Sequence, residues 1–184
     1  MTPDQKNPWK TLSGKEIYEN PWIKIDEYQV INPGGGRGIY GKVHFKNKAI
    51  GIVPFDAQGN TWLVGQWRYT LDEWSWEIPE GGSGMDEDPL TSAKRELREE
   101  TGLSATDWKM IQRTHLSNSV SDEVGFLFLA EGLTQGKDDL EESEADLKVW
   151  KLPFRDALQM VLDGKITDSL SVIGLLAVAR IKNI

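Results

Sequence analysis

Apolar and polar residues alternate along N-terminal stretches at 23–30 and 39–45, and the short apolar pair at 17–18 before them belongs to the same strand pattern. Alternation with a period of two predicts β-strands, because successive side chains of a strand point to opposite faces of a sheet. The segment 32–36 reads Asn-Pro-Gly-Gly-Gly and predicts a turn between the two longer strands. Residues 1–15 are polar and are expected to form a loosely held arm. The strands carry too little apolar surface to form a core of their own, so we expect an antiparallel unit that is stabilised by packing against another part of the protein.

Further along the chain, apolar stretches predict strands on both sides of one amphipathic helix. The expected strands are 49–55, 61–68 and 74–79 before the helix and 108–115, 124–130 and 148–152 after it. Two terminal segments, 153–162 and 167–181, predict helices. This order indicates an α+β fold with a mixed sheet between helices. We expect one domain over residues 47–184, with residues 1–46 as an extension that does not fold independently.

The mid-chain helix has an unusually dense face of carboxylates. Pro89 suits its first turn and Gly102 suits its C-terminal cap. Between them, Glu96, Glu99 and Glu100 fall at positions i, i+3 and i+4 and share one face. Arg95 relieves their repulsion only in part, whereas a hard divalent cation such as Mg²⁺ would relieve the rest. The alternative is a merely solvated face, which is the common case for a Glu-rich helix.

The composition excludes several classes of protein. With no cysteine among 184 residues, disulfides, a thiol nucleophile and Cys-type zinc sites are excluded. Acidic residues outnumber basic ones by 29 to 21, and the net charge of −8 argues against a nucleic-acid partner. A bound metal ion would reverse the local sign, so a small phosphorylated substrate stays compatible. The polar N-terminus and the lack of a bilayer-length apolar run predict a cytoplasmic protein without a membrane partner.

The helix and the loop before it also follow a known motif. The Nudix box reads Gly-x5-Glu-x7-Arg-Glu-U-x-Glu-Glu-x-Gly-U, where U is a bulky aliphatic residue. Its nine defined positions are matched by Gly81, Glu87, Arg95, Glu96, Leu97, Glu99, Glu100, Gly102 and Leu103. The chain therefore resembles the Nudix hydrolases. The resemblance implies their α/β/α sandwich with a mixed sheet, here with an added N-terminal antiparallel strand unit, and attack of water on a phosphorus of a substituted nucleoside diphosphate.

The resemblance also implies roles for residues of the box. The metal ligands would be the carboxylates of Glu96, Glu99 and Glu100 and the backbone carbonyl of Glu80, and the metal would be Mg²⁺, with Mn²⁺ as a substitute. Four other residues would have structural roles. Glu87 and Arg95 would pair and hold the loop on the helix, whereas Gly81 and Gly102 would serve special backbone conformations.

The sequence before the box bears on the substrate. The run Gln66-Trp67-Arg68-Tyr69, followed by Trp76-Glu77-Ile78-Pro79-Glu80-Gly81, resembles the pyrophosphatases of ADP-ribose and nucleoside-diphosphate sugars. We take Arg68, Glu77 and Glu123 as substrate-binding candidates, since a guanidinium can hold a phosphate through two hydrogen bonds. Arg68 could instead pair with Glu77 or another carboxylate, and Glu123 could lie in a merely solvated loop. Ser119 stands where the ADP-ribose group often has proline, which leaves a broader sugar-nucleotide range open.

The acidic segment 138–144 is the candidate source of a general base. In similar enzymes a glutamate at about this place activates the water, and Glu142 and Glu144 both fit within a small alignment shift. Glu142 is slightly preferred, and Glu99 is also counted among the catalytic candidates. The alternative is a mobile, solvated run of charge over residues 135–146.

Together these observations predict a Mg²⁺-dependent pyrophosphatase that hydrolyses nucleoside-diphosphate sugars such as ADP-ribose to a nucleoside monophosphate and a sugar phosphate. The group's N-terminal strands usually cross to a partner subunit, so we expect a homodimer with shared active sites, in which Trp22, Tyr28 or Arg37 could reach a base or a phosphate. Two alternatives remain. One is a housecleaning hydrolase of nucleoside triphosphates or dinucleoside polyphosphates, and the other is a non-catalytic sensor of ADP-ribose or a sugar nucleotide.

Overall fold

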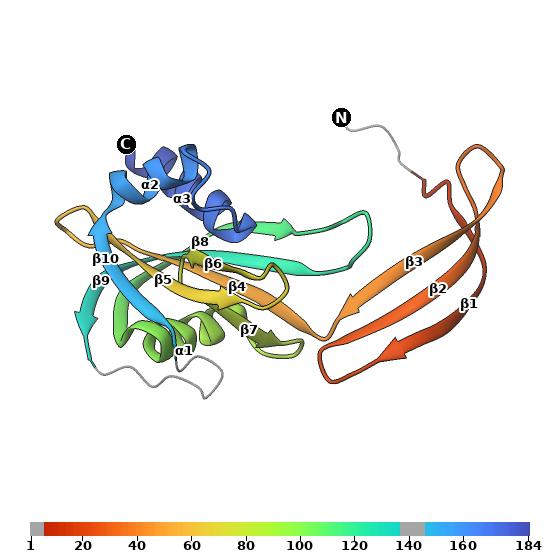
Figure 1. Cartoon of the computed structure of the whole chain (residues 1–184), viewed down its shortest axis with the longest axis horizontal. Coiled ribbons are helices and arrows are strands. Elements are labelled where there is room, and N and C mark those ends of the chain that lie inside the picture. The colour runs from red at the N-terminus through yellow and green to blue at the C-terminus, as the bar shows by residue number, and fades with distance from the viewer. Residues whose placement is uncertain (1–5, 137–145) are drawn as a thin grey trace. The chain divides into compact units, whose positions relative to one another are not determined.

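The computed structural model describes residues 6–136 and 146–184. The chain divides into two compact units (Figure 1). One runs to Asn47 and also includes Ser117–Glu123, and the other comprises Lys48–Leu116 and Val124–Ile184. The boundary expected between residues 46 and 47 lies one residue from the end of the first unit, but the grouping of residues 117–123 with that unit was not foreseen. Among the described residues, no helix combines the length and the apolar character needed to cross a membrane.

The N-terminal unit is an antiparallel sheet in the order β1-β2-β3. Its strands are β1 (Lys10–Glu19), β2 (Ile23–Ile31) and β3 (Arg37–Phe45). The turn before β3 is held by Asn32, whose Oδ1 accepts hydrogen bonds from the N–H groups of Gly34 and Gly36, both at 3.0 Å. The prediction of an arm over residues 1–15 was wrong from Lys10 onward. Every residue of β1 is exposed, so this strand shows no apolar alternation.

The segment 117–123 pairs with the edge strand β3. The N–H of Val43 donates to the carbonyl of Val120 at 2.8 Å, and the N–H of Asp122 donates to the carbonyl of Val43 at 3.2 Å. The carboxylate of Asp122 lies 2.6 Å from Nδ1 of His44 and 3.2 Å from Nζ of Lys42. Backbone pairing and charge together fix this segment on the N-terminal sheet.

The second unit contains seven strands and three helices among the described residues. Its elements are β4 (Asn47–Pro54), β5 (Asn60–Arg68), β6 (Glu73–Glu77), β7 (Glu80–Gly84), α1 (Pro89–Thr101), β8 (Leu103–His115), β9 (Val124–Gln135), β10 (Lys148–Pro153), α2 (Phe154–Leu162) and α3 (Ser169–Lys182). The predicted mixed sheet is present in the order β7-β4-β9-β8, with β4 and β9 parallel and β8 antiparallel to β9. A second, antiparallel sheet in the order β10-β5-β6 accompanies it, which the single-sheet prediction did not include.

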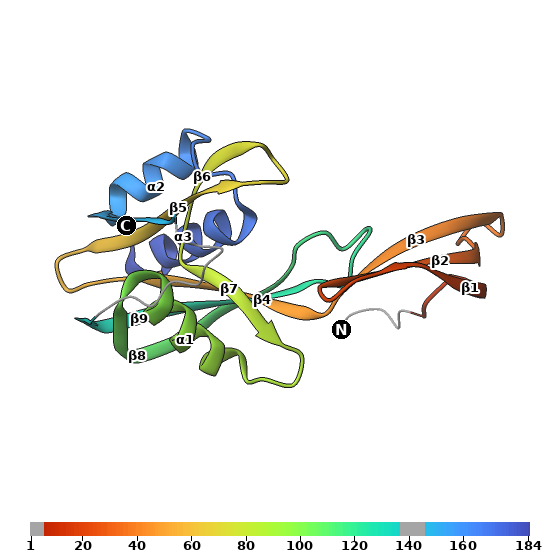
Figure 2. The same ribbon diagram turned by 60° about the horizontal axis from the view of Figure 1, so that its bottom comes forward.

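Alternate residues of the central strands supply the two apolar cores of this unit. On β4, Ile50 and Ile52 belong to the cluster that contains Leu97 of α1, whereas Val53 belongs to the cluster that contains Leu175 of α3. Strand β9 divides in the same way, because successive side chains of a strand point to opposite faces. In both views α1 lies on the opposite side of these strands from α2 and α3 (Figures 1 and 2). The predicted α/β/α layering is thus confirmed.

Two strand segments around the box helix were missed. Strand β7 lies in what was expected to be a Gly-rich loop, and β8 begins at Leu103 rather than near residue 108. Glycines and short polar residues have low strand propensity, so these segments are strands only because they pair with β4 and β9. The helix caps have the expected form. The side chain of Asp88 accepts from the N–H of Thr91, and Gly102 has φ of 69°.

The loop between β4 and β5 is held by Asp56. Its Oδ1 accepts from the backbone N–H groups of Gln58 and Asn60, at 2.9 and 2.8 Å. Its Oδ2 lies 2.9 Å from Nζ of Lys151 on β10. Burial raises the pKa of Asp56, but hydrogen bonds from Asn60 and the ion pair with Lys151 outweigh it and lower the pKa to about 2.

We expect Asp56→Asn to lower the free energy of unfolding by about 2 kcal/mol at neutral pH, because each unit of pKa shift corresponds to roughly 1.4 kcal/mol. The pKa of Asp56 is depressed in the folded protein, so its contribution is present above the ordinary value of 3.8 and is lost as the pH falls toward about 2. Urea unfolding of both proteins at neutral pH and at about pH 3 measures this. A difference in stability that does not shrink at the lower pH contradicts the assignment.

Candidate active site

Two buried carboxylates of α1 meet the backbone at the start of β7. Glu100 is 1% exposed, and its Oε2 accepts a hydrogen bond from the N–H of Glu80 at 2.9 Å. Glu96 is 6% exposed, and its carboxylate lies against Gly81. The spacing of four residues places both side chains on one face of α1, as expected, and the pairing of β7 with β4 brings the backbone of Glu80 and Gly81 to that face.

Position 81 requires glycine because a side chain would not fit there, and not because of its backbone conformation. Its φ is not in the left-handed region, unlike that of Gly102. A Cβ atom at position 81 would lie 2.1 Å from Cδ of Glu96 and 2.3 Å from its Oε2. The expectation of a special backbone angle is therefore corrected for Gly81. The missing side chain makes room for the Glu96 carboxylate.

Arg95 contacts two carboxylates of its own helix and the loop before it, but not the glutamate that was expected as its partner. Its guanidinium lies 2.8 Å from Oε1 of Glu96, donates to Oε2 of Glu99 at 2.8 Å, and donates to the carbonyl of Gly82 at 2.8 Å. The expected pair between Arg95 and Glu87 is not formed in the described part of the chain. Glu96 and Glu99 lie one and four residues further along the same helix and occupy the guanidinium, so Arg95 holds the loop through the Gly82 carbonyl instead.

Arg68 pairs with Glu77, which is the alternative considered for it. Its Nε donates to Oε1 of Glu77 at 2.8 Å, and its Nη2 bonds the other carboxylate oxygen. Glu77 is only 2% exposed, so its carboxylate meets Arg68 rather than an open surface. The hydrogen bonds that Arg68 donates to Glu77 raise the pKa of Arg68, and the nearby carboxyls of Glu80 and Asp168 add to the effect. These hydrogen bonds to Glu77 use Nε and Nη2 of the Arg68 guanidinium and do not involve its Nη1.

The side chain of Glu80 points into a second group of polar residues. Its Oε1 accepts a hydrogen bond from Oγ of Ser171 on α3, at 3.1 Å. Burial raises the pKa of Glu80 well above its usual value, and the carboxyls of Asp168 and Glu77 raise it further. Neither Asp168 nor Ser171 was a candidate from the sequence. The only signal there is the Asp-x-x-Ser spacing at the start of a helix, which indicates a cap and no relation to residue 80.

The residues present fit a hydrated Mg²⁺ ion. Glu96, Glu100 and the carbonyl of Glu80 offer only oxygen atoms as ligands, which is what a hard cation requires. Because Gly81 has no side chain, the carboxylate of Glu96 has room beside it. Within the described ranges, no three His, Asp or Glu side chains are grouped closely enough to hold a metal ion by themselves. Glu99 is paired with Arg95. Two carboxylates and one carbonyl are enough for Mg²⁺, which keeps several of its waters.

Three candidates from the sequence remain, and the structure describes one of them, Glu123. Glu123 is partly buried and ends the segment 117–123, which pairs with β3 in the N-terminal unit. Glu142 and Glu144 fall within residues 137–145 and lie outside the described residues. Their assignment as general bases therefore stays a prediction.

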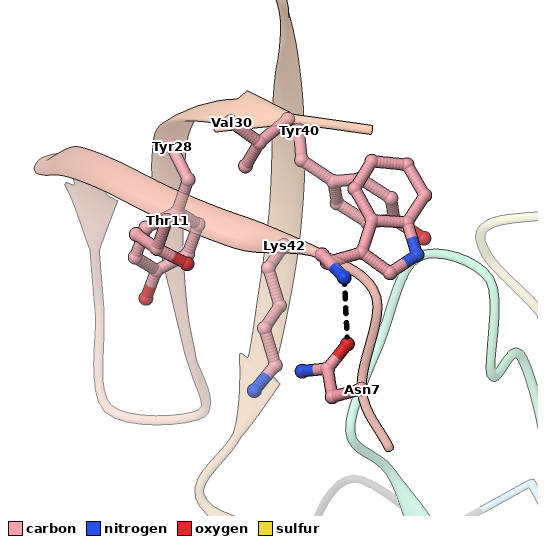
Figure 3. A pocket seen from close by; sticks show the side chains of 7 residues that line it. Asn7, Thr11, Tyr28, Val30, Tyr40 and Lys42 are labelled. Carbon is pink, nitrogen blue, oxygen red and sulfur yellow. Dashed lines mark hydrogen bonds between the residues drawn. The ribbon is translucent and has the colours of Figure 1, made fainter. Parts of the chain in front are cut away.

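The N-terminal unit has a cavity of about 440 Å³ on one face of its sheet (Figure 3). Its lining comes from all three strands and the residues before them: Asn7, Trp9, Thr11, Tyr28, Val30, Tyr40 and Lys42. Tyr28 and Tyr40 are cross-strand partners, and the ring of Trp9 meets that of Tyr40 edge to face with centroids 5.4 Å apart. The ammonium group of Lys42, which is paired with Asp122 at 3.2 Å, adds a positive charge. Aromatic faces beside a cation suit a flat, anionic ligand.

Comparison with known proteins agrees with this geometry. The NUDIX domain family matches residues 45–168, and the family described as nucleoside diphosphate sugar hydrolase N-terminal domain matches residues 9–43. An ADP-ribose pyrophosphatase of Mycobacterium tuberculosis is 34% identical over 94% of this chain and 84% of its own length. An ADP-ribose pyrophosphatase of Bacillus subtilis is 29% identical over 87% of this chain and 86% of its own length.

A solved structure supports the same fold. The crystal structure of an ADP compounds hydrolase matches with a TM-score of 0.86 at 16% identity, over 97% of this chain and 96% of that one. At this identity the likeness shows the fold alone. The family match over most of the chain, together with the similarity to the mycobacterial enzyme over nearly its whole length, shows that the chain belongs to the Nudix hydrolase family.

Proposed function

We propose that this Nudix hydrolase is a Mg²⁺-dependent pyrophosphatase of nucleoside-diphosphate sugars, with ADP-ribose among its substrates. The observation that carries the proposal is the meeting of the Glu96 and Glu100 carboxylates with the backbone of Glu80 and Gly81. The match of residues 9–43 to the N-terminal domain of nucleoside diphosphate sugar hydrolases, and the names of the two similar pyrophosphatases, support the substrate class.

A divalent cation bound by Glu96, Glu100 and the Glu80 carbonyl would neutralise the diphosphate and lower the pKa of a water. The chain's own residues have separate tasks. Glu100 fixes the Glu80 backbone, Arg95 keeps Glu96 and Glu99 in place, and Nη1 of Arg68 donates to a phosphate oxygen while Glu77 holds the rest of the guanidinium.

The reaction consumes one water. An oxygen–phosphorus bond forms to that water as the bridging P–O bond of the diphosphate breaks, and the two products are a nucleoside monophosphate and a sugar phosphate. The proton of the water passes to a carboxylate acting as general base. Glu142 and Glu144 are the proposed bases.

The cavity of the N-terminal unit is the proposed site of the nucleobase. Its aromatic lining includes Tyr28, whereas Trp22 and Arg37, the other two residues considered for this role, do not line it. The proposed homodimer, in which these strands complete the partner's active site, would bring the cavity to the diphosphate. Light scattering of the purified chain tests the dimer. The dimer and the cytoplasmic location stay predictions.

We expect Trp9→Ala to raise the KM for ADP-ribose about tenfold with little change in kcat, because an aromatic contact to a base is worth roughly 1–3 kcal/mol. Trp22→Ala is the matched control. Trp22 is an exposed tryptophan of the same unit, 67% exposed, but it does not line the cavity, so its KM should stay near that of the wild type. Steady-state kinetics of both variants measure the effect. Equal changes in the two variants would argue against a base in this cavity.

The function itself is tested with a panel of substrates. Hydrolysis is followed by phosphate release, coupled through a phosphatase, for ADP-ribose, other sugar nucleotides, nucleoside triphosphates and dinucleoside polyphosphates, each with Mg²⁺ or Mn²⁺. The proposal expects the sugar nucleotides to have the highest kcat/KM. A preference for the triphosphates or polyphosphates supports the housecleaning alternative, and ligand binding without turnover supports the sensor.

A further inference from the structure

The segment that carries the proposed metal-binding carbonyl is held from both sides. Residues 78 and 79 connect β6 to β7, which begins at Glu80. On one side, the N–H of Glu80 donates to Glu100 of α1 at 2.9 Å. On the other, the N–H of Ile78 donates to Oγ of Ser171 on α3, also at 2.9 Å. The carbonyl of Pro79 accepts from the N–H of Ile52 on β4 at 2.8 Å.

Ser171 makes two hydrogen bonds that leave its hydroxyl little freedom. Its Oγ accepts from Ile78 and donates to Oε1 of Glu80 at 3.1 Å, and the residue has no exposed surface. Its own N–H donates to Oδ2 of Asp168 at 2.8 Å, which fixes the first turn of α3. One hydroxyl therefore ties both ends of the segment 78–80 to the helix on the far side of the strands from α1.

We propose that Ser171 is a positioning residue of the metal site, acting through its two hydrogen bonds to fix the backbone of residues 78–80 against the carboxylate of Glu100. The proposal rests on the proposed function, since the Glu80 carbonyl is taken as a metal ligand. Hydrogen bonds that orient metal ligands commonly change metal affinity when they are removed. A hydroxyl that only satisfied a buried N–H would affect folding stability and leave the metal affinity of the folded protein unchanged.

The side chain of Glu80 supplies an independent way to remove the contact. Glu80→Ala leaves Ser171 in the chain and deletes the acceptor of the Ser171 hydroxyl, together with the hydrogen bond between the Glu80 and Asp168 side chains, which Ser171→Ala leaves in place. Glu80→Gln keeps an oxygen at the same place and the same side-chain length, so it should retain the hydrogen bond. The proposed ligand is the backbone carbonyl of residue 80, which both substitutions leave in the chain. Agreement between Ser171→Ala and Glu80→Ala, with Glu80→Gln unchanged, identifies the hydrogen bond as the cause.

The test measures Mn²⁺ binding to the substrate-free protein by electron paramagnetic resonance, with thermal unfolding as the check on folding. We expect Ser171→Ala and Glu80→Ala to raise the Kd for Mn²⁺ about tenfold, while Glu80→Gln stays near the wild type. Thr61→Val is the matched control. Thr61 is also fully buried, and its hydroxyl has no hydrogen-bond partner in the described part of the chain, so its loss should leave the Kd unchanged.

The outcomes separate this proposal from the one on which it rests. If the wild type binds Mn²⁺ and hydrolyses ADP-ribose, but both folded variants bind Mn²⁺ with the wild-type Kd, the role of Ser171 alone is overturned. If the wild type neither binds Mn²⁺ nor hydrolyses any sugar nucleotide, the proposed function fails and this inference fails with it. Should Ser171→Ala not fold, the comparison of Glu80→Ala with Glu80→Gln decides the question.

Discussion

Glu100→Gln is expected to lower kcat for ADP-ribose by about 1,000-fold, which corresponds to about 4 kcal/mol of transition-state stabilisation. Glu100 is buried and holds the Glu80 N–H, so it is both a proposed metal ligand and the link between α1 and β7. Glutamine keeps the size of the side chain and an oxygen that accepts the same hydrogen bond. The fold should therefore survive while the negative charge that binds the cation is lost.

The measurement is kcat at saturating Mg²⁺, with thermal unfolding of the same samples. Glu131→Gln is a suitable control, because it makes the same chemical change at a partly exposed glutamate on β9 that is paired with Lys182, 2.6 Å away. Its kcat should stay within about twofold of the wild type, as expected for a surface ion pair of small energetic value. Wild-type turnover by Glu100→Gln would remove Glu100 from the proposed metal site.

Gly81→Ala is expected to lower kcat/KM by about 100-fold, because displacement of a reacting group by about 1 Å has an effect of that order. The added methyl group would stand 2.1 Å from Cδ of Glu96, closer than any real contact, so the carboxylate must move. The backbone at this position has no left-handed angle, and the chain itself can accept alanine. The effect should therefore fall on the site more than on the stability of the fold.

Gly84→Ala provides the comparison on the same strand. A Cβ atom at position 84 would have its nearest neighbour, Cβ of Glu87, at 3.9 Å, which is an ordinary contact. We expect this variant to keep kcat/KM within about threefold of the wild type, as is usual for a substitution that removes no contact. Kinetics and urea unfolding of the two alanine variants, side by side, distinguish displacement of Glu96 from a general loss of β7. Equal activity of the two variants would contradict the role given to Gly81.

Much of the fold followed from local patterns. Apolar stretches indicated β4, β5 and β9, and Pro89 and Gly102 marked the two ends of α1. Only the end of β1, at residues 17–18, was expected as a strand, because all of its residues are exposed, and β7 was missed because glycines dominate it. A strand of either kind is defined by its pairing partner rather than by its own side chains, so a reading of local sequence could not find it.

The candidate site also has features that the sequence predicted and others that only the structure shows. The shared face of Glu96 and Glu100 follows from the helical repeat, and the ion pair between Arg68 and Glu77 was one of the two alternatives considered. The role of Arg95 was expected but its partner was not, because Glu96, Glu99 and the Gly82 carbonyl compete for one guanidinium. Which partner prevails depends on how closely the loop lies to the helix.

By itself, the sequence determined that a capped helix presents carboxylates to one side, and that its spacing matches the Nudix box. Helical geometry is local, so residues three and four positions apart share a face wherever the helix lies. Only the tertiary structure decided what that face meets. Strand pairing carries Glu80 to Glu100, and packing of α3 brings Ser171 to Glu80, 91 residues earlier in the chain. Such contacts depend on where separate elements pack in space, which no spacing along the chain encodes.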